Sequence, residues 1–115
     1  MGAGYLVVGL GDSVVSAIHC ETPGCRSYAL VLGDLATRKL GTVAAINLGR
    51  IHDLGTDGLL AMLRDESSVR AAVARADVIT IGVGWNDWQG PCHWEGHEAC
   101  LADGQERGER NLDAA

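Results

Sequence analysis

The chain has 115 residues, which is the length of one domain rather than two at roughly 100–200 residues each. Hydrophobic residues make up 47% of it and charged residues 21%, a composition that excludes a mostly disordered protein. The net charge of -6 excludes nucleic acid and anionic membranes as expected partners, and no apolar run is long enough to form an integral membrane segment. A small-molecule substrate fits this composition better.

The first half of the chain predicts two strands with a helix between them. Residues 5–10 form a short apolar run between glycines, which is typical of a strand buried on both faces. A helix is expected over 28–40, because Ser27 can cap its start and Gly41 can end it. Residues 42–48 predict the second strand.

The second half continues the alternation of helices and strands. Thr56 can cap a helix, a further helical stretch covers 67–76, and 76–83 is a β-branched third strand. Residues 102–115 form a polar tail whose end, 110–115, has the pattern of the first turn of another helix. This order predicts a parallel sheet with helices on its faces.

The four cysteines fall into two close pairs, Cys20 with Cys25 and Cys92 with Cys100. This pattern predicts two short-loop disulfides and an oxidising compartment, so the protein is expected to be secreted or extracytoplasmic. The first eleven residues have neither a basic segment nor a small-residue cleavage site, so we expect no signal peptide in this sequence.

Polar and flexible residues follow each predicted strand. Ligands bind beyond the carboxyl ends of the strands in an open parallel sheet, so these positions are the first candidates for a site. The three groups are Gly11, Asp12 and Ser13, then Asn47, Leu48 and Gly49, then Gly84, Trp85, Asn86 and Asp87. They supply a hydroxyl, backbone N–H groups and a side-chain amide, which are the parts of a serine nucleophile with an oxyanion hole.

These ordered blocks, up to about Cys100, resemble the SGNH hydrolases, also called the GDSL esterase/lipase family. The resemblance implies a three-layer α/β sandwich with a parallel, flavodoxin-like sheet, of which this chain holds about the first three strands. It implies hydrolysis of a small-molecule, lipid or carbohydrate ester, with no metal or organic cofactor. By the same resemblance Ser13 is the nucleophile, and the oxyanion donors are the backbone N–H groups of Ser13 and Gly49 and the side chain of Asn86. Gly55 is the second choice for the Gly49 role, and Asp12 and Gly84 support the site.

The family's fourth block, Asp-x-x-His, has no counterpart in the sequence. The four histidines are His19, His52, His93 and His97, and the residues three positions before them are Ser16, Gly49, Gly90 and Trp94. A serine without an oriented imidazole is a weak nucleophile near neutral pH. We therefore expect residues 1–115 to be a single incomplete domain, and the alternative is a catalytically inactive or binding-only fragment.

Each block also has a purely structural interpretation. Asp12 or Ser13 can simply cap the helix that follows the first strand. Asn86 with Asp87 can form an ordinary turn, and Gly49 can be an ordinary strand exit. The order of all three blocks, each at the end of a strand, favours the hydrolase interpretation.

Three other functions are weaker alternatives. A structural zinc site can be drawn from two cysteines and two histidines within nine residues, namely Cys92, His93, His97 and Cys100. A dinucleotide fingerprint begins at Gly9 and Gly11, but Val14 occupies its third glycine position. An α/β-hydrolase elbow needs Gly-x-Ser-x-Gly, and the sequence after Ser13 does not provide it.

Overall fold

The computed structural model describes residues 4–17, 20, 22–50, 54–87, 92 and 98–115. Its strands are β1 (Tyr5–Gly11), β2 (Val43–Gly49) and β3 (Val78–Gly82). Its helices are α1 (Ser13–Ser16), α2 (Tyr28–Leu40), α3 (Thr56–Asp65), α4 (Ser67–Arg75) and α5 (Glu98–Ala114). The three strands and the helices expected at 28–40, at Thr56 and at 67–76 are therefore confirmed within one or two residues at their ends.

The described strands form one parallel sheet with the order β2-β1-β3. β1 is the central strand, and the register pairs Gly11 with Gly49 on one side and with Gly82 on the other. This topology confirms the expected α/β fold with a parallel flavodoxin-like sheet, because the chain passes from β1 to one neighbour and then crosses to the other. All three strands consequently end at the same edge.

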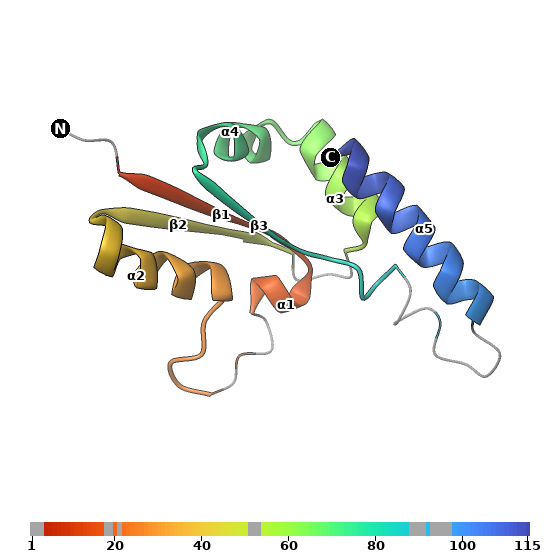
Figure 1. Cartoon of the computed structure of the whole chain (residues 1–115), viewed down its shortest axis with the longest axis horizontal. Coiled ribbons are helices and arrows are strands. Elements are labelled where there is room, and N and C mark those ends of the chain that lie inside the picture. The colour runs from red at the N-terminus through yellow and green to blue at the C-terminus, as the bar shows by residue number, and fades with distance from the viewer. Residues whose placement is uncertain (1–3, 18–19, 21, 51–53, 88–91, 93–97) are drawn as a thin grey trace.

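The main hydrophobic core lies between the sheet and the helices α3 and α4 (Figure 1). Val8 and Leu10 point from β1 into this core, where they meet Leu59 and Met62 of α3 and Val69 of α4. The alternation of these β1 residues follows from the period of two along a strand. This core fixes the position at which β1 ends and α3 begins.

The helices α1 and α2 cover the opposite face of the sheet (Figure 1). Glycines allow α2 to pack closely there, since a Cβ at Gly9 would lie 2.6 Å from the Cβ of Ala29. Gly33 of α2 makes the same kind of approach to β2, because a Cβ at Gly33 would lie 2.8 Å from the Cβ of Ala45. Neither position accepts a larger side chain without a shift of the helix.

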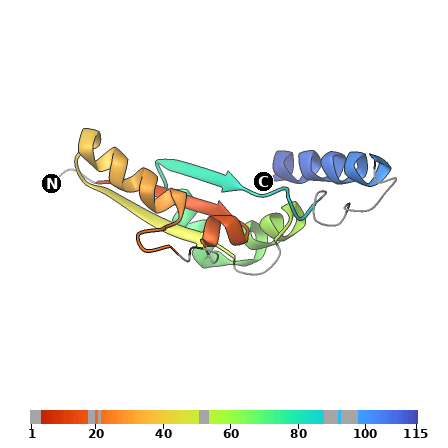
Figure 2. The ribbon, with the colours of Figure 1, turned by 90° about the horizontal axis from the view of Figure 1, so that it is seen from below.

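The C-terminal segment differs from the sequence expectation of a polar tail with one helical turn at its end. It is a helix over Glu98–Ala114, and its buried residues are Gly104 and Gly108. α5 packs against α3, although it has little apolar side-chain area. Figure 2 shows α5 beyond the carboxyl ends of the strands rather than over the sheet.

Both expected disulfides are confirmed. Cys20 bonds to Cys25 with 5.3 Å between their Cα atoms, and Cys92 bonds to Cys100 with 5.7 Å. The second bridge uses both cysteines of the zinc alternative, and His93 and His97 lie outside the described residues. Among the helices that the structure describes, none has the length and apolar character needed to cross a bilayer.

Candidate active site

Ser13 is the first residue of α1, directly after β1. Asp12 is the N-cap residue of this helix, and its buried carboxylate accepts a hydrogen bond from the N–H of Val14 at 3.0 Å. The capping role expected as the structural alternative for Asp12 is thus present. It also serves a site at Ser13, because a fixed helix start fixes the serine on it.

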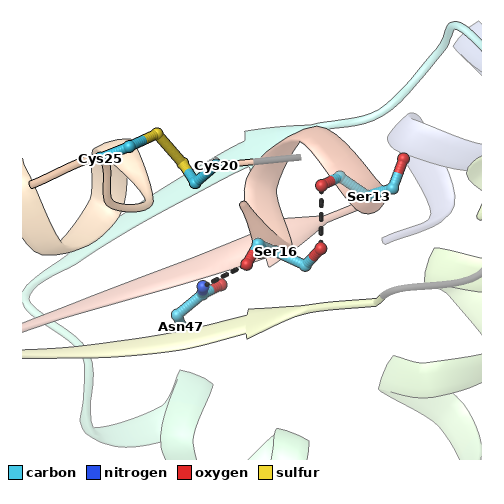
Figure 3. The surroundings of a disulfide bond; sticks show 5 residues. All are labelled: Ser13, Ser16, Cys20, Cys25 and Asn47. Atoms are coloured by element: carbon cyan, nitrogen blue, oxygen red, sulfur yellow. Dashed lines mark hydrogen bonds between the residues drawn. A yellow bond between two sulfur atoms is a disulfide. The ribbon is translucent and has the colours of Figure 1, made fainter. Parts of the chain in front are cut away.

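The Ser13 hydroxyl lies on the side of α1 that faces away from β2 (Figure 3). Ser16 donates from its hydroxyl to the Ser13 carbonyl at 2.8 Å, and Figure 3 shows the Ser13 hydroxyl pointing away from Ser16 and Asn47. Ser13 is half-buried and lines a hollow of about 220 Å³ together with Val14, Ala17 and Cys20. This hollow leaves room for a small group next to the hydroxyl.

Gly11 permits the close contacts that place Ser13. A Cβ at this position would lie 2.3 Å from the Gly82 carbonyl oxygen of β3 and 2.4 Å from a methyl carbon of Val15. The backbone of the first block therefore fits between β3 and α1 only as glycine. The N–H of Asp12 donates to the Gly82 carbonyl at 3.1 Å and holds the block in this position.

Gly49 lies against α1 at the end of β2. A Cβ on Gly49 would lie 2.4 Å from the backbone nitrogen of Ser16, so the close approach of β2 to α1 requires glycine. The Gly49 N–H donates to the side-chain oxygen of Asn47 at 2.9 Å, and the Asn47 amide donates to the Ser16 carbonyl at 3.4 Å (Figure 3). The N–H expected to stabilise an oxyanion is therefore already hydrogen-bonded in this structure.

Asn86 lies in the turn after β3, beside the start of α3. This turn closes with the Asp87 N–H donating to the Gly84 carbonyl at 3.0 Å, and Gly84 has a φ of 133°. The side-chain amide of Asn86 donates to the Leu54 carbonyl at 3.2 Å. Asn86 is thus brought next to Gly55, the second-choice donor, rather than to Gly49.

Asp87 caps α3 from the turn after β3. The helix has Gly55 at its N-cap, which has no side chain to bond the free N–H groups of the first turn. The buried carboxylate of Asp87 replaces it and accepts from the Thr56 N–H at 2.9 and 3.1 Å and from the Thr56 hydroxyl at 2.6 Å. Thr56 was expected to be the cap itself, and it is instead the first helical residue, held by a side chain 31 positions away.

Asn86 and Asp87 form the expected turn, and they also bond to the segment at the start of α3. An ordinary turn needs neither a buried carboxylate nor contacts to a second segment. The capping function of Asp87 was not predicted from the sequence, because Thr56 was itself expected to be the cap.

A larger hollow of about 420 Å³ lies beyond β3, between α3 and α5. Its described lining consists of Thr56, Val83, Leu101, Gln105, Gly108, Glu109 and Leu112. Ser13 is not among these residues, so this hollow is separate from the one at the serine. The described residues contain no group of three or more acidic, histidine or cysteine side chains suited to hold a metal ion.

The four histidines lie outside the described residues. The structure therefore places no imidazole relative to Ser13. The three sequence blocks are placed, and the strands that carry them end at one edge of the sheet as expected.

Three solved structures share this fold. The lipase Lip_vut3 from a goat rumen metagenome superposes with a TM-score of 0.79 at 24% identity, over 96% of this chain and 53% of its own. AlinE4, an SGNH-hydrolase family esterase, gives 0.59 at 20% identity over 96% and 56%, and TesA gives 0.51 at 18% over 92% and 55%. No family model and no curated protein matches the sequence.

The resemblance to the SGNH hydrolases is thus confirmed at the level of the fold. At these identities the comparisons describe the architecture and not the chemistry. The chain spans about half the length of the solved structures it matches.

Proposed function

We propose that this chain is the nucleophile-bearing part of an SGNH-type carboxylic ester hydrolase. One observation carries the proposal. The three parallel strands end at the same level in the sheet, so Ser13 and the turn of Asn86 lie at one edge. The same blocks, in the same order, suggested the family from sequence, and the fold agrees with it.

The reaction begins with attack of the Ser13 hydroxyl oxygen on the carbonyl carbon of the ester, while the hydroxyl proton passes to a general base. The resulting tetrahedral oxyanion collapses, the bond to the alcohol oxygen breaks, and the alcohol leaves with that proton. Water then attacks the acyl-Ser13 ester and releases the carboxylic acid and the free serine. The base corresponds to the family's Asp-x-x-His block, for which residues 1–115 contain no match.

The oxyanion donors in this proposal are the Ser13 N–H, the Asn86 side-chain amide and the Gly55 N–H. Gly55 is favoured over Gly49 for two reasons. The Gly49 N–H already donates to Asn47, and Gly55 lies at the start of α3, the segment that the turn of Asn86 contacts. Donors fixed before the reaction stabilise the developing charge by about 3 kcal/mol each.

The hollow beside Ser13 suits a small substituent of the ester, since Val14 and Ala17 line it. The disulfides support a location outside the cytoplasm, because such bonds form and persist in oxidising compartments.

The test is covalent labelling of the full-length protein with a fluorophosphonate, together with turnover of a p-nitrophenyl ester. We expect the wild type to be labelled on Ser13, and Ser13→Ala to lose both labelling and turnover. Ser68→Ala is the matched control, because Ser68 is exposed on α4, away from the carboxyl edge of the sheet (Figure 1). Turnover that survives in Ser13→Ala, or its absence from the wild type, contradicts the proposal.

A further inference from the structure

α5 contacts the turn of Asn86 and Asp87 through Arg107 and the start of α3 through Asn111. Arg107 donates from Nη2 to the Asp87 carbonyl oxygen at 2.8 Å, and its Nε lies 3.8 Å from the Asp87 carboxylate. Asn111, one turn further along α5, donates from its amide to the Thr56 hydroxyl at 3.0 Å and to the Asp57 carboxylate at 2.7 Å. Both side chains therefore hold the junction between the turn and the start of α3.

These contacts form a continuous chain of hydrogen bonds. The Asn111 amide donates to the Thr56 hydroxyl, which in turn donates to Asp87. The Asp87 side chain is only 2% exposed, so it depends on these protein partners rather than on water. The Arg107 side chain is 40% exposed, so it acts on Asp87 mainly through its hydrogen bond to the backbone carbonyl rather than through its charge.

The position of Asn86 depends on this junction. Asn86 and Asp87 are consecutive residues of one turn, so a shift of Asp87 moves the amide of its neighbour. The Gly55 backbone is packed on the same carboxylate, since a Cβ at Gly55 would lie 3.2 Å from it. Asp87 thus sets the distance between the two groups that the proposed function assigns to the oxyanion.

We propose that Arg107 and Asn111 are positioning residues for the oxyanion hole. Through them α5 holds the turn of Asn86 and Asp87 in place. Neither residue touches the reacting atoms. Arg107 fixes the backbone of Asp87, and Asn111 orients the Thr56 hydroxyl toward the Asp87 carboxylate. The inference rests on the proposed ester hydrolysis and extends it to a helix that has no residue in the family's blocks.

The experiment compares Arg107→Ala and Asn111→Ala with Arg110→Ala in the full-length protein. Arg110 is the matched control, because it lies on the same helix but pairs with Glu106 through a side chain that is 67% exposed. The readouts are kcat and KM for a p-nitrophenyl ester and the inhibition constant of an alkyl boronic acid, which forms a tetrahedral adduct with the serine. Apparent affinity falls with the folded fraction, so circular dichroism first verifies that each variant is folded under the assay conditions, and the inhibition constant then separates positioning from stability.

We expect Arg107→Ala and Asn111→Ala to lower kcat about tenfold to a hundredfold with KM nearly unchanged, since a displaced donor acts in the transition state. The boronic acid should bind more weakly by a similar factor, and Arg107→Lys should recover part of both losses. If Arg107→Ala fails to fold, Arg107→Gln keeps the length and a donor group and is measured in its place.

Unchanged kcat and boronic acid affinity in the variants of Arg107 and Asn111, with an active wild type, overturn the positioning role alone. Equal losses in Arg110→Ala overturn it as well. An inactive wild type contradicts the proposed function itself, so the two failures are distinguishable.

Discussion

The carboxylate of Asp87 accepts hydrogen bonds from both the backbone N–H and the hydroxyl of Thr56, at 2.6 to 3.1 Å. One buried side chain therefore joins the turn after β3 to the first residue of α3. It gives the helix the cap that Gly55 lacks and holds Asn86 beside the same helix start.

Replacing Asp87 with alanine is expected to lower the free energy of unfolding by about 2–4 kcal/mol. The change removes a helix cap and leaves the Thr56 N–H and hydroxyl without their buried acceptor. Urea unfolding followed by circular dichroism measures the loss. Asp113→Ala is the control on an exposed carboxylate near the end of α5, and an equal effect of both changes would refute this account of Asp87.

Replacing Asn86 with alanine tests the third block directly. The expected effect is a fall in kcat of about 10²- to 10³-fold in the full-length protein, as for the loss of one oxyanion donor. Fluorophosphonate labelling of Ser13 should also become slower, while KM changes little. A loss of less than about threefold in kcat would remove Asn86 from the proposed oxyanion hole.

A larger side chain at position 49 is expected to lower the free energy of unfolding, because it would overpack the contact between β2 and α1. In Gly49→Ala the new methyl group meets the backbone of α1 at 2.4 Å, and overpacking of this kind costs about 1–3 kcal/mol. Ala44→Val is the control, because Ala44 is exposed on the same strand and the added methyl groups extend from a solvent-facing position. Thermal unfolding followed by circular dichroism gives both values, and a neutral Gly49→Ala would show that α1 moves freely away from β2.

Ala17 adopts a backbone conformation that favours glycine. It ends α1 with a φ of 62° and a ψ of 30°, and it is the one described non-glycine residue with a positive φ. Ala17→Gly is therefore expected to raise the free energy of unfolding by up to about 1 kcal/mol. The same variant widens the hollow at Ser13, and a lower melting temperature would contradict the expected relief of strain.

The sequence predicted the sheet well because each strand has its own local signal. The apolar run between glycines located β1, and the order of elements then brought Ser13 and Asn86 to one edge. The cysteine pairs were also predictable, since each bridge closes a short loop. These features depend on residues close together in the chain.

The remaining parts of the site depend on contacts between distant residues. Nothing near Thr56 identifies Asp87, 31 positions further along the chain, as the side chain that caps α3. α5 was predicted to be a polar tail because its buried residues are two glycines, which add no apolar side chain to the sequence pattern. Periodicity of hydrophobic residues does not detect a helix of this kind.

β3 leaves its large side chains exposed in residues 1–115. Val78, Ile79 and Ile81 keep 46%, 41% and 49% of their surface in contact with solvent, although strands of a parallel sheet are normally covered on both faces. Residues 1–115 produced alone are therefore expected to bind an apolar dye and to unfold over a broad temperature range.

The double variant Ile79→Thr/Ile81→Thr tests which surface binds the dye. It keeps β-branched side chains on β3 but removes apolar area, so the dye fluorescence should fall by about half or more while the circular dichroism spectrum is retained. Val31→Thr is the control, because Val31 is 37% exposed on α2, on a helix that covers the sheet. Dye binding that is unchanged in the β3 variant, or a sharp two-state transition without dye binding in the original chain, would show that this strand is not the exposed apolar surface.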